Sequence, residues 1–225
     1  MSSDIRRFII FFTILLAIAI IYPLGVSIGE EDSTVKIQGE SIEFDGTKQV
    51  AIIEGNVVVI YGSWQLTSER GEYDDAKGEV RLFGGVKVQG SNDYEGTNFE
   101  AMNMTIFMST RMIKADDQVL ISYDNIIISS ESASFDIENE LFTAEKNGKI
   151  IYYNKGEGAG SHNNIEAVYG KALFFMSEDR ILLTGNPKVV RGSNTFTGKE
   201  IVIYLKDNKI QASGGTKLEI EGVGL

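Results

Sequence analysis

Apolar and polar residues alternate with a period of two along most of the chain after residue 32. Met102, Met104 and Ile106, for example, alternate with Asn103 and Thr105. Successive side chains of a β-strand point to opposite faces, so this pattern predicts strands with one apolar face each. No stretch of this part of the chain has the period of an amphipathic helix. The residues predicted to face inward are Val86, Val88, Met102, Met104, Ile106, Phe135, Ile137, Ile201, Ile203 and Leu205.

The predicted strands recur in similar units. Each unit starts with a strand of alternating polarity, and in most units a turn rich in Gly or Asn and a β-branched strand follow. The units begin 25 to 37 residues apart, at residues 41, 66, 94, 128, 165 and 196, a spacing that is typical of repeat architectures. Two strands cannot bury an apolar face alone, whereas stacked units share one interior. A solenoid and a rolled sandwich both satisfy this requirement, and the unequal unit lengths favour an all-β fold, a long antiparallel β-jelly roll.

An apolar run of 21 residues without a charge covers residues 8–28, between Arg7 and Glu30. As a helix it would span about 31 Å, roughly the hydrocarbon core of a bilayer. Two interpretations stay open, a single-span membrane anchor and a signal peptide cleaved near residue 29. We therefore divide the chain into residues 1–29 and a β-domain over residues 30–225. We expect this domain in the periplasm, tethered to the inner membrane if the apolar run is retained.

Net charge and cysteine content exclude several classes of protein. Basic residues number 21 and acidic residues 32, so the formal net charge is −11. A nucleic-acid binder needs a basic face to displace counterions from phosphates, and we therefore expect no nucleic-acid partner. The chain has no cysteine, which excludes disulfides, zinc ribbons, thiol nucleophiles and iron–sulfur clusters.

Few residues could carry catalysis. The one histidine, His162, lies in a Gly- and Asn-rich stretch over residues 154–167, which predicts a solvated surface loop. The acidic pairs at residues 74–75 and 116–117 are candidate calcium ligands, but neither has EF-hand spacing, and solvated turn carboxylates explain them better. Trp64, the one tryptophan, gives no aromatic platform for sugars or bases. We therefore expect no enzyme activity, no cofactor and no metal site.

One part of the chain resembles a known repeat. Residues 182–215 read LLTGNPKVVRGSNTFTGKEIVIYLKDNKIQASGG. This segment resembles the repeat of the OstA-like or LptA family of lipopolysaccharide-transport periplasmic proteins, to which LptC is related. Residues 41–88 repeat the same plan and residues 94–181 match it more loosely. The residues that carry the resemblance are Gly55, Asn56, Val57, Gly85, Val86, Gly185, Asn186, Val189, Val190, Gly198, Ile201, Tyr204, Leu205 and Gly214.

The resemblance implies an open, V-shaped β-jelly roll whose apolar groove binds the acyl chains of lipopolysaccharide. It makes the ten inward-facing residues candidates for contact with lipid A. The implied partners are other jelly-roll components of an export bridge, or further copies of this chain, joined by edge strands near residues 35–44 and 217–221. Two roles in that machine stay open, a periplasmic LptA-like component and an LptC-like component anchored in the inner membrane.

Two other functions also stay open. A structural β-repeat protein of the cell envelope would have a filled core, and an exported jelly-roll enzyme would have a pair of carboxylates in a concave polar site. Composition alone favours an ordinary core, because methionines such as Met104 and Met176 fill irregular gaps as readily as they adapt to ligands.

Overall fold

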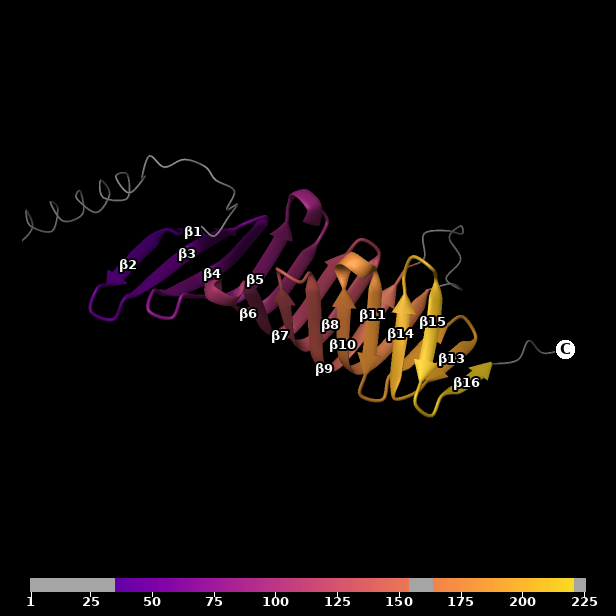
Figure 1. Ribbon diagram of the computed structural model, residues 1–225. Helices are drawn as coiled ribbons and strands as arrows, with labels where there is room; N and C mark the ends of the chain where they lie inside the picture. Colours follow the sequence, from indigo (N-terminus) through magenta and orange to yellow (C-terminus); the bar gives the residue numbers. More distant parts are fainter. Residues whose placement is uncertain (1–34, 154–163, 221–225) are drawn as a thin grey trace, which may run out of the picture. The chain divides into compact units, whose positions relative to one another are not determined.

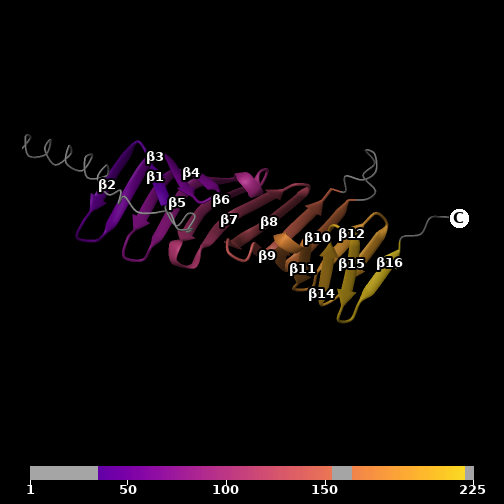
Figure 2. The same ribbon diagram turned by 45° about the horizontal axis from the view of Figure 1, so that its top comes forward.

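The computed structural model describes residues 35–153 and 164–220, which belong to a compact unit spanning residues 32–225. Within these residues, 16 strands form one antiparallel sheet, and they follow one another nearly in chain order (Figures 1 and 2). Short 3₁₀ turns lie at η1 (Asn92–Tyr94), η2 (Met108–Thr110) and η4 (Met176–Glu178). The strands are β1 (Val35–Gln38), β2 (Ser41–Asp45), β3 (Val50–Tyr61), β4 (Trp64–Asp74), β5 (Glu79–Gly90), β6 (Asn98–Phe107), β7 (Met112–Tyr123), β8 (Ile126–Asp136), β9 (Leu141–Tyr152), β10 (Ile165–Phe175), β11 (Arg180–Thr184), β12 (Lys188–Arg191), β13 (Asn194–Thr197), β14 (Glu200–Tyr204), β15 (Lys209–Ser213) and β16 (Lys217–Ile220).

The predicted all-β, antiparallel architecture is confirmed. The predicted N-terminal helix and residues 154–163 of the predicted loop, with His162, lie outside the described residues. The loop prediction is wrong for residues 165–167, which begin strand β10. None of the residues that the structure does describe forms a helix long and apolar enough to cross a membrane.

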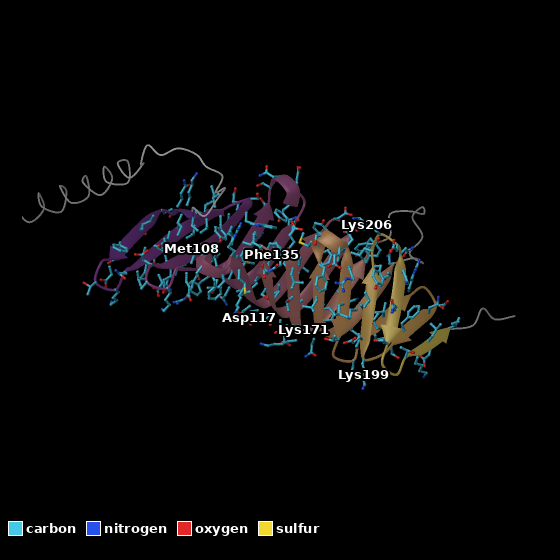
Figure 3. All side chains as sticks on the ribbon, in the orientation of Figure 1. Met108, Asp117, Phe135, Lys171, Lys199 and Lys206 are labelled. Carbon is cyan, nitrogen blue, oxygen red and sulfur yellow. The ribbon has the colours of Figure 1, made fainter. Side chains whose placement is uncertain are left out.

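Each long strand from β3 to β10 bends near its middle. On the odd-numbered strands, two successive residues with positive φ oppose one residue of the following strand. Such β-bulges bend a strand and increase its twist, so the aligned bulges make one bend across the sheet. Figure 3 labels Asp117 in the bulge of β7 and Lys171 beside Gly170, the residue that opposes the bulge of β9. The bulged pairs are Gly55-Asn56, Gly84-Gly85, Asp117-Gln118 and Lys146-Asn147, and the opposing residues are Glu69, Met102, Glu131 and Gly170.

The sequence pattern predicted turns at these Gly and Asn residues, and that prediction is wrong for β3, β5 and β9. The residues lie inside continuous bent strands there, because a left-handed φ suits a tight turn and a bulge equally well. Gly84 shows why the bend needs glycine. Its φ is +83°, and a Cβ at this position would lie 3.0 Å from the Cβ of Glu69 on the preceding strand, β4.

The bend divides the sheet into two leaves. Leaf A contains the whole of β2, β11, β14 and β15. From the strands β3–β10, it also contains the first half of each odd-numbered strand and the second half of each even-numbered strand. Leaf B contains β1, β12, β13 and β16 with the remaining halves. Both leaves contribute to one hydrophobic core, so the sheet encloses its interior by folding over on itself.

The two leaves pack with an offset along the chain. Phe99, on the leaf B half of β6, lies 4.6 Å from Phe142, on the leaf A half of β9, between ring centroids. Tyr123 on β7 and Phe174 on β10 repeat this relationship at 5.6 Å. A strand half in leaf B thus covers the leaf A half of a strand about three positions further along, which is the geometry of a roll.

Candidate functional site

Two rows of apolar side chains line the inner face of leaf A. The row next to the bend has small side chains in its middle, where four alanines on β7 to β10 lie in direct register. Leaf B faces both rows with β-branched and aromatic side chains. The row next to the bend contains Met104, Ala115, Ala133, Ala144, Ala172, Leu183 and Ile201, and the outer row contains Val80, Ile106, Ile113, Phe135, Phe142, Phe174, Ile181 and Ile203.

The structure buries most of the predicted inward-facing residues in this interior. Ile137, directly after β8, is partly buried and packs against the same core. The alternation of polarity therefore identified the inner face correctly at these positions. The buried residues of the predicted set are Val86, Val88, Met104, Ile106, Phe135, Ile201, Ile203 and Leu205.

Met102 is the exception, and its prediction as an inward-facing residue is wrong. Its side chain is 42% exposed, whereas that of Met104 is 3% exposed. Met102 opposes the bulge of Gly84 and Gly85, and the alternation on β6 slips by one residue there. The inward residues of β6 are Phe99 and Ala101 before the bend and Met104 and Ile106 after it.

Aromatic rings fill much of the interior that the sequence analysis left unassigned. Phe135 and Phe142 stack with centroids 4.4 Å apart, and Trp64 lies 4.7 Å from Tyr94. A narrow apolar hollow of about 20 Å³ lies beside Met104, which is roughly the room that one water molecule needs. Trp64, Phe99 and Phe142 occupy apolar positions of alternating strands, so the same pattern could have identified them.

Contacts between the leaves also close the side opposite the bend. We call the turns of leaf A on this side rim A and those of leaf B rim B. Rim A consists of residues 45–50, 74–79, 107–112, 136–141, 175–180 and 204–209. Rim B consists of residues 61–64, 90–98, 123–126 and 191–194, together with the end of β9 and the start of β10. The Tyr94 hydroxyl on rim B donates to Glu140 Oε1 on rim A at 3.0 Å. Figure 3 labels Met108 and Lys206 on rim A.

Further along the rims the contacts continue. The Tyr152 hydroxyl donates to the Leu205 carbonyl oxygen at 3.4 Å, and Arg191 Nη1 donates to the Asn208 carbonyl oxygen at 3.0 Å. Tyr123 lies beside the ion pair of Asp179 and Lys206.

Two tyrosines of rim B have a raised pKa. Burial raises the pKa of Tyr61, against the opposing effect of the Arg111 guanidinium on rim A. Burial also raises the pKa of Tyr123, and the negative charge of Asp179 adds to that effect. Both phenols therefore keep their hydroxyl protons at neutral pH.

The acidic pairs considered as calcium ligands make local contacts. The Asp74 carboxylate accepts hydrogen bonds from the backbone and side chain of Lys77, and Asp75 accepts the Tyr73 hydroxyl at 2.7 Å. Asp117 has a positive φ in the β7 bulge. No group of three or more His, Asp or Glu side chains that could hold a metal ion occurs among the residues that the structure describes.

Comparison with known proteins assigns the family. The model of a family described as lipopolysaccharide-assembly, LptC-related, matches residues 38–153, or 116 of the 225 residues. The chain belongs to this LptC-related family. The resemblance to lipopolysaccharide-transport proteins, inferred from the repeats, is thereby confirmed.

Among solved structures, the chain is similar to the crystal structure of LptH, the LptA homologous periplasmic component of the conserved lipopolysaccharide transport device from Pseudomonas aeruginosa. The two sequences are 16% identical, the match covers 84% of this chain and 96% of that chain, and the TM-score is 0.32. No curated protein matches the chain.

Proposed function

We propose that this protein is an LptC-like component of a lipopolysaccharide export bridge and that it holds the acyl chains of lipid A between its two leaves. One observation carries the proposal: a chain of the LptC-related family folds one long sheet over an apolar interior that runs from β3 to β14. The sugar head of the lipid would stay in water outside the rims.

The physical need for such a protein is large. Each methylene group moved from water to an apolar environment is stabilised by about 0.8 kcal/mol, so a lipid with several acyl chains does not cross an aqueous space unescorted. The inner faces of leaves A and B offer Val, Ile, Leu, Met and Phe side chains as a substitute for the membrane interior. The chain shows no nucleotide-binding motif, so a partner would supply the energy for transport.

The family match supports an LptC-like role over the LptA-like one. In that role, residues 8–28 would anchor the chain in the inner membrane, with the β-domain in the periplasm. A reporter that is active only outside the cytoplasm, fused after Leu225, should be active, and a full-length chain should resist extraction by sodium carbonate. An inactive reporter would contradict export of the domain.

Assembly into a bridge would use the two ends of the sheet. Within the described residues, β1 and β2 pair only with β3, while β15 pairs only with β14 and β16 only with β13. Unpaired strand edges are ready templates for pairing with another chain. Since β2 and β16 lie at opposite ends of this unit (Figures 1 and 2), we propose that neighbouring jelly rolls add at both ends.

Photo-crosslinking tests lipid binding with a pair of matched positions. A photoreactive residue at Met104, which is 3% exposed and inside, should capture lipopolysaccharide in cells. The same residue at Met102, two positions away and 42% exposed, should capture little. Both variants must first show a β-sheet spectrum and a cooperative melt. Equal capture from both positions, or none from Met104 in a folded protein, would favour a structural envelope protein with a closed core.

A further inference from the structure

Rim B presents a tyrosine at four successive hairpins. These residues are Tyr61, Tyr94, Tyr123 and Tyr152, at intervals of 33, 29 and 29 residues, and Arg191 occupies the equivalent place at the next hairpin. Tyr61 and Tyr152 are buried and the other two are half-buried. A phenol suits this place because its ring packs on the apolar interior while its hydroxyl reaches a polar partner.

The partners of these side chains all lie on rim A. They are the Glu140 carboxylate for Tyr94 and backbone carbonyl oxygens for Tyr152 and Arg191, and the Arg111 guanidinium is the charged group that acts on Tyr61. For Tyr123, the neighbouring group is the Asp179–Lys206 ion pair. We call this row of contacts the tyrosine seam; it runs along the side of the roll opposite the bend.

The interior is too tightly filled for an acyl chain while the seam is closed. Side chains of both leaves are buried against one another in a single core, and the hollow of about 20 Å³ beside Met104 is far smaller than a fatty-acyl chain. An acyl chain can therefore bind between the leaves only if they separate. The bend is continuous backbone in β3 to β10, and separation there would break strands. The seam consists of side-chain contacts, each of which is modest in strength and breaks independently of the others.

We infer that acyl chains enter the interior sideways between the two rims and that the tyrosine seam is the latch that controls this entry. The inference rests on the proposed function for the identity of the ligand, but the opening of the rims is a property of the protein alone. Pairwise opening would admit one acyl chain at a time, and the seam would close again behind it. Entry through the ends of the roll is the competing route.

Tyr→Phe substitutions test the latch with matched controls. Tyr94→Phe combined with Tyr152→Phe removes two hydroxyls that bridge the rims. Tyr73→Phe combined with Tyr169→Phe removes two hydroxyls whose partners, Asp75 and the Ser129 carbonyl, do not lie across the seam. The seam variant should bind lipopolysaccharide at least about tenfold faster than wild type, because it loses one hydrogen bond to a carboxylate and one to a backbone carbonyl oxygen. The control variant should bind at the wild-type rate.

The distance between two spin labels, one on each rim, measures opening of the rims in the absence of lipid. The chain has no cysteine, so Glu95→Cys on rim B and Glu138→Cys on rim A, both at exposed positions, give a unique labelled pair. The distance distribution should broaden toward longer values in the seam variant and stay narrow in the control. Unchanged distances in the seam variant would overturn the latch, whether or not lipid binds.

The same cysteine pair tests the route. A short bismaleimide joining the two cysteines should block uptake of purified lipopolysaccharide, while capping each cysteine with N-ethylmaleimide should leave uptake intact. Uptake at the wild-type rate by the bridged protein would overturn sideways entry in favour of the ends. Opening of the labelled rims with no uptake by any variant would contradict the proposed function and leave the latch supported.

Discussion

The indole ring of Trp64 on β4 lies 5.3 Å from the ring of Phe135 on β8, measured between centroids, in an edge-on arrangement. Trp64 belongs to leaf B and Phe135 to leaf A, four strands further along the chain. This contact joins segments that share no backbone hydrogen bonds, and Phe99 and Phe142 extend it along the interior. The roll therefore depends on side-chain packing between distant strands as well as on the sheet itself.

Phe135→Ala should destabilise the fold strongly. Phe135 is 3% exposed and contacts four other rings, and truncation of such a residue costs about 3–5 kcal/mol. Phe175→Ala is the control, because its half-buried ring lies on the outer face of leaf A beneath the Arg180 guanidinium, a contact worth about 0.5–1 kcal/mol. Urea unfolding of both variants measures the difference. Equal losses would mean that the interior does not hold the leaves together.

Gly148→Ala should disturb the inner side of the bend. A Cβ at Gly148 would overlap the ring of Tyr169, whose hydroxyl donates to the Ser129 carbonyl oxygen at 3.1 Å. Overpacking of this kind costs about 1–3 kcal/mol. At Gly46 the same substitution meets only an ordinary contact, 3.6 Å from a ring atom of Phe44, and its effect should stay within about 0.5 kcal/mol. Thermal unfolding compares the two, and similar midpoints would contradict the tight packing at Gly148.

Stability should fall in acid because three turn aspartates are stabilised in their charged form. Hydrogen bonds from the side chain and backbone of Asn139 hold the pKa of Asp136 below its usual value, and contacts with Lys48 and Lys77 lower the pKa of Asp45 and Asp74. A lowered folded pKa gives stability that is complete above the unfolded value of about 4 and is lost as the pH falls further.

Urea unfolding between pH 7 and pH 3 measures this effect. The free energy of unfolding should stay level down to about pH 5 and then decline. Asp136→Asn should lower stability at pH 7 and flatten the decline, because one of the titrating groups is gone. A decline as steep as that of wild type would show that Asp136 contributes nothing to the acid sensitivity.

Local sequence pattern was sufficient to predict the strands and most of the inner face, because alternation reports which side of a strand is buried. It predicted the wrong face for Met102, where the alternation slips opposite a bulge, and it predicted a turn at Gly84-Gly85, which form that bulge. Neither error could be avoided from the residues alone, since a bulge and a turn require the same left-handed backbone.

The offset between the leaves and the tyrosine seam could not be predicted at all. The pairs Tyr94–Glu140 and Tyr152–Leu205 are 46 and 53 residues apart, and nothing in the local sequence links one member to the other. Their partnership follows from how far the sheet rolls, which depends on the twist accumulated over several strands.

The offset leaves apolar side chains uncovered at the ends of the described unit. Ile42 and Phe44 on β2 are 54% and 59% exposed, and they continue the inner face of leaf A because they pair with the inward-facing Ile53 and Ala51. Leu218, in register with Phe196, likewise continues the inner face of leaf B and is 55% exposed. Contact between the β16 end of one molecule and the β2 end of the next is heterologous, so it would join molecules into an open, head-to-tail chain.

Leu218→Arg should therefore weaken association at one end of the domain, and Ile42→Arg should weaken it at the other. Both side chains are exposed, so the fold should survive, which a cooperative melt verifies. Ile60→Arg is the control, because Ile60 is 39% exposed but lies between the buried Val59 and Tyr61 and so faces outward. Sedimentation should show self-association of wild type and the control, and monomers for each end variant alone. A mixture of the two end variants should form dimers through their intact ends, whereas dimers of either variant alone would contradict end-to-end assembly.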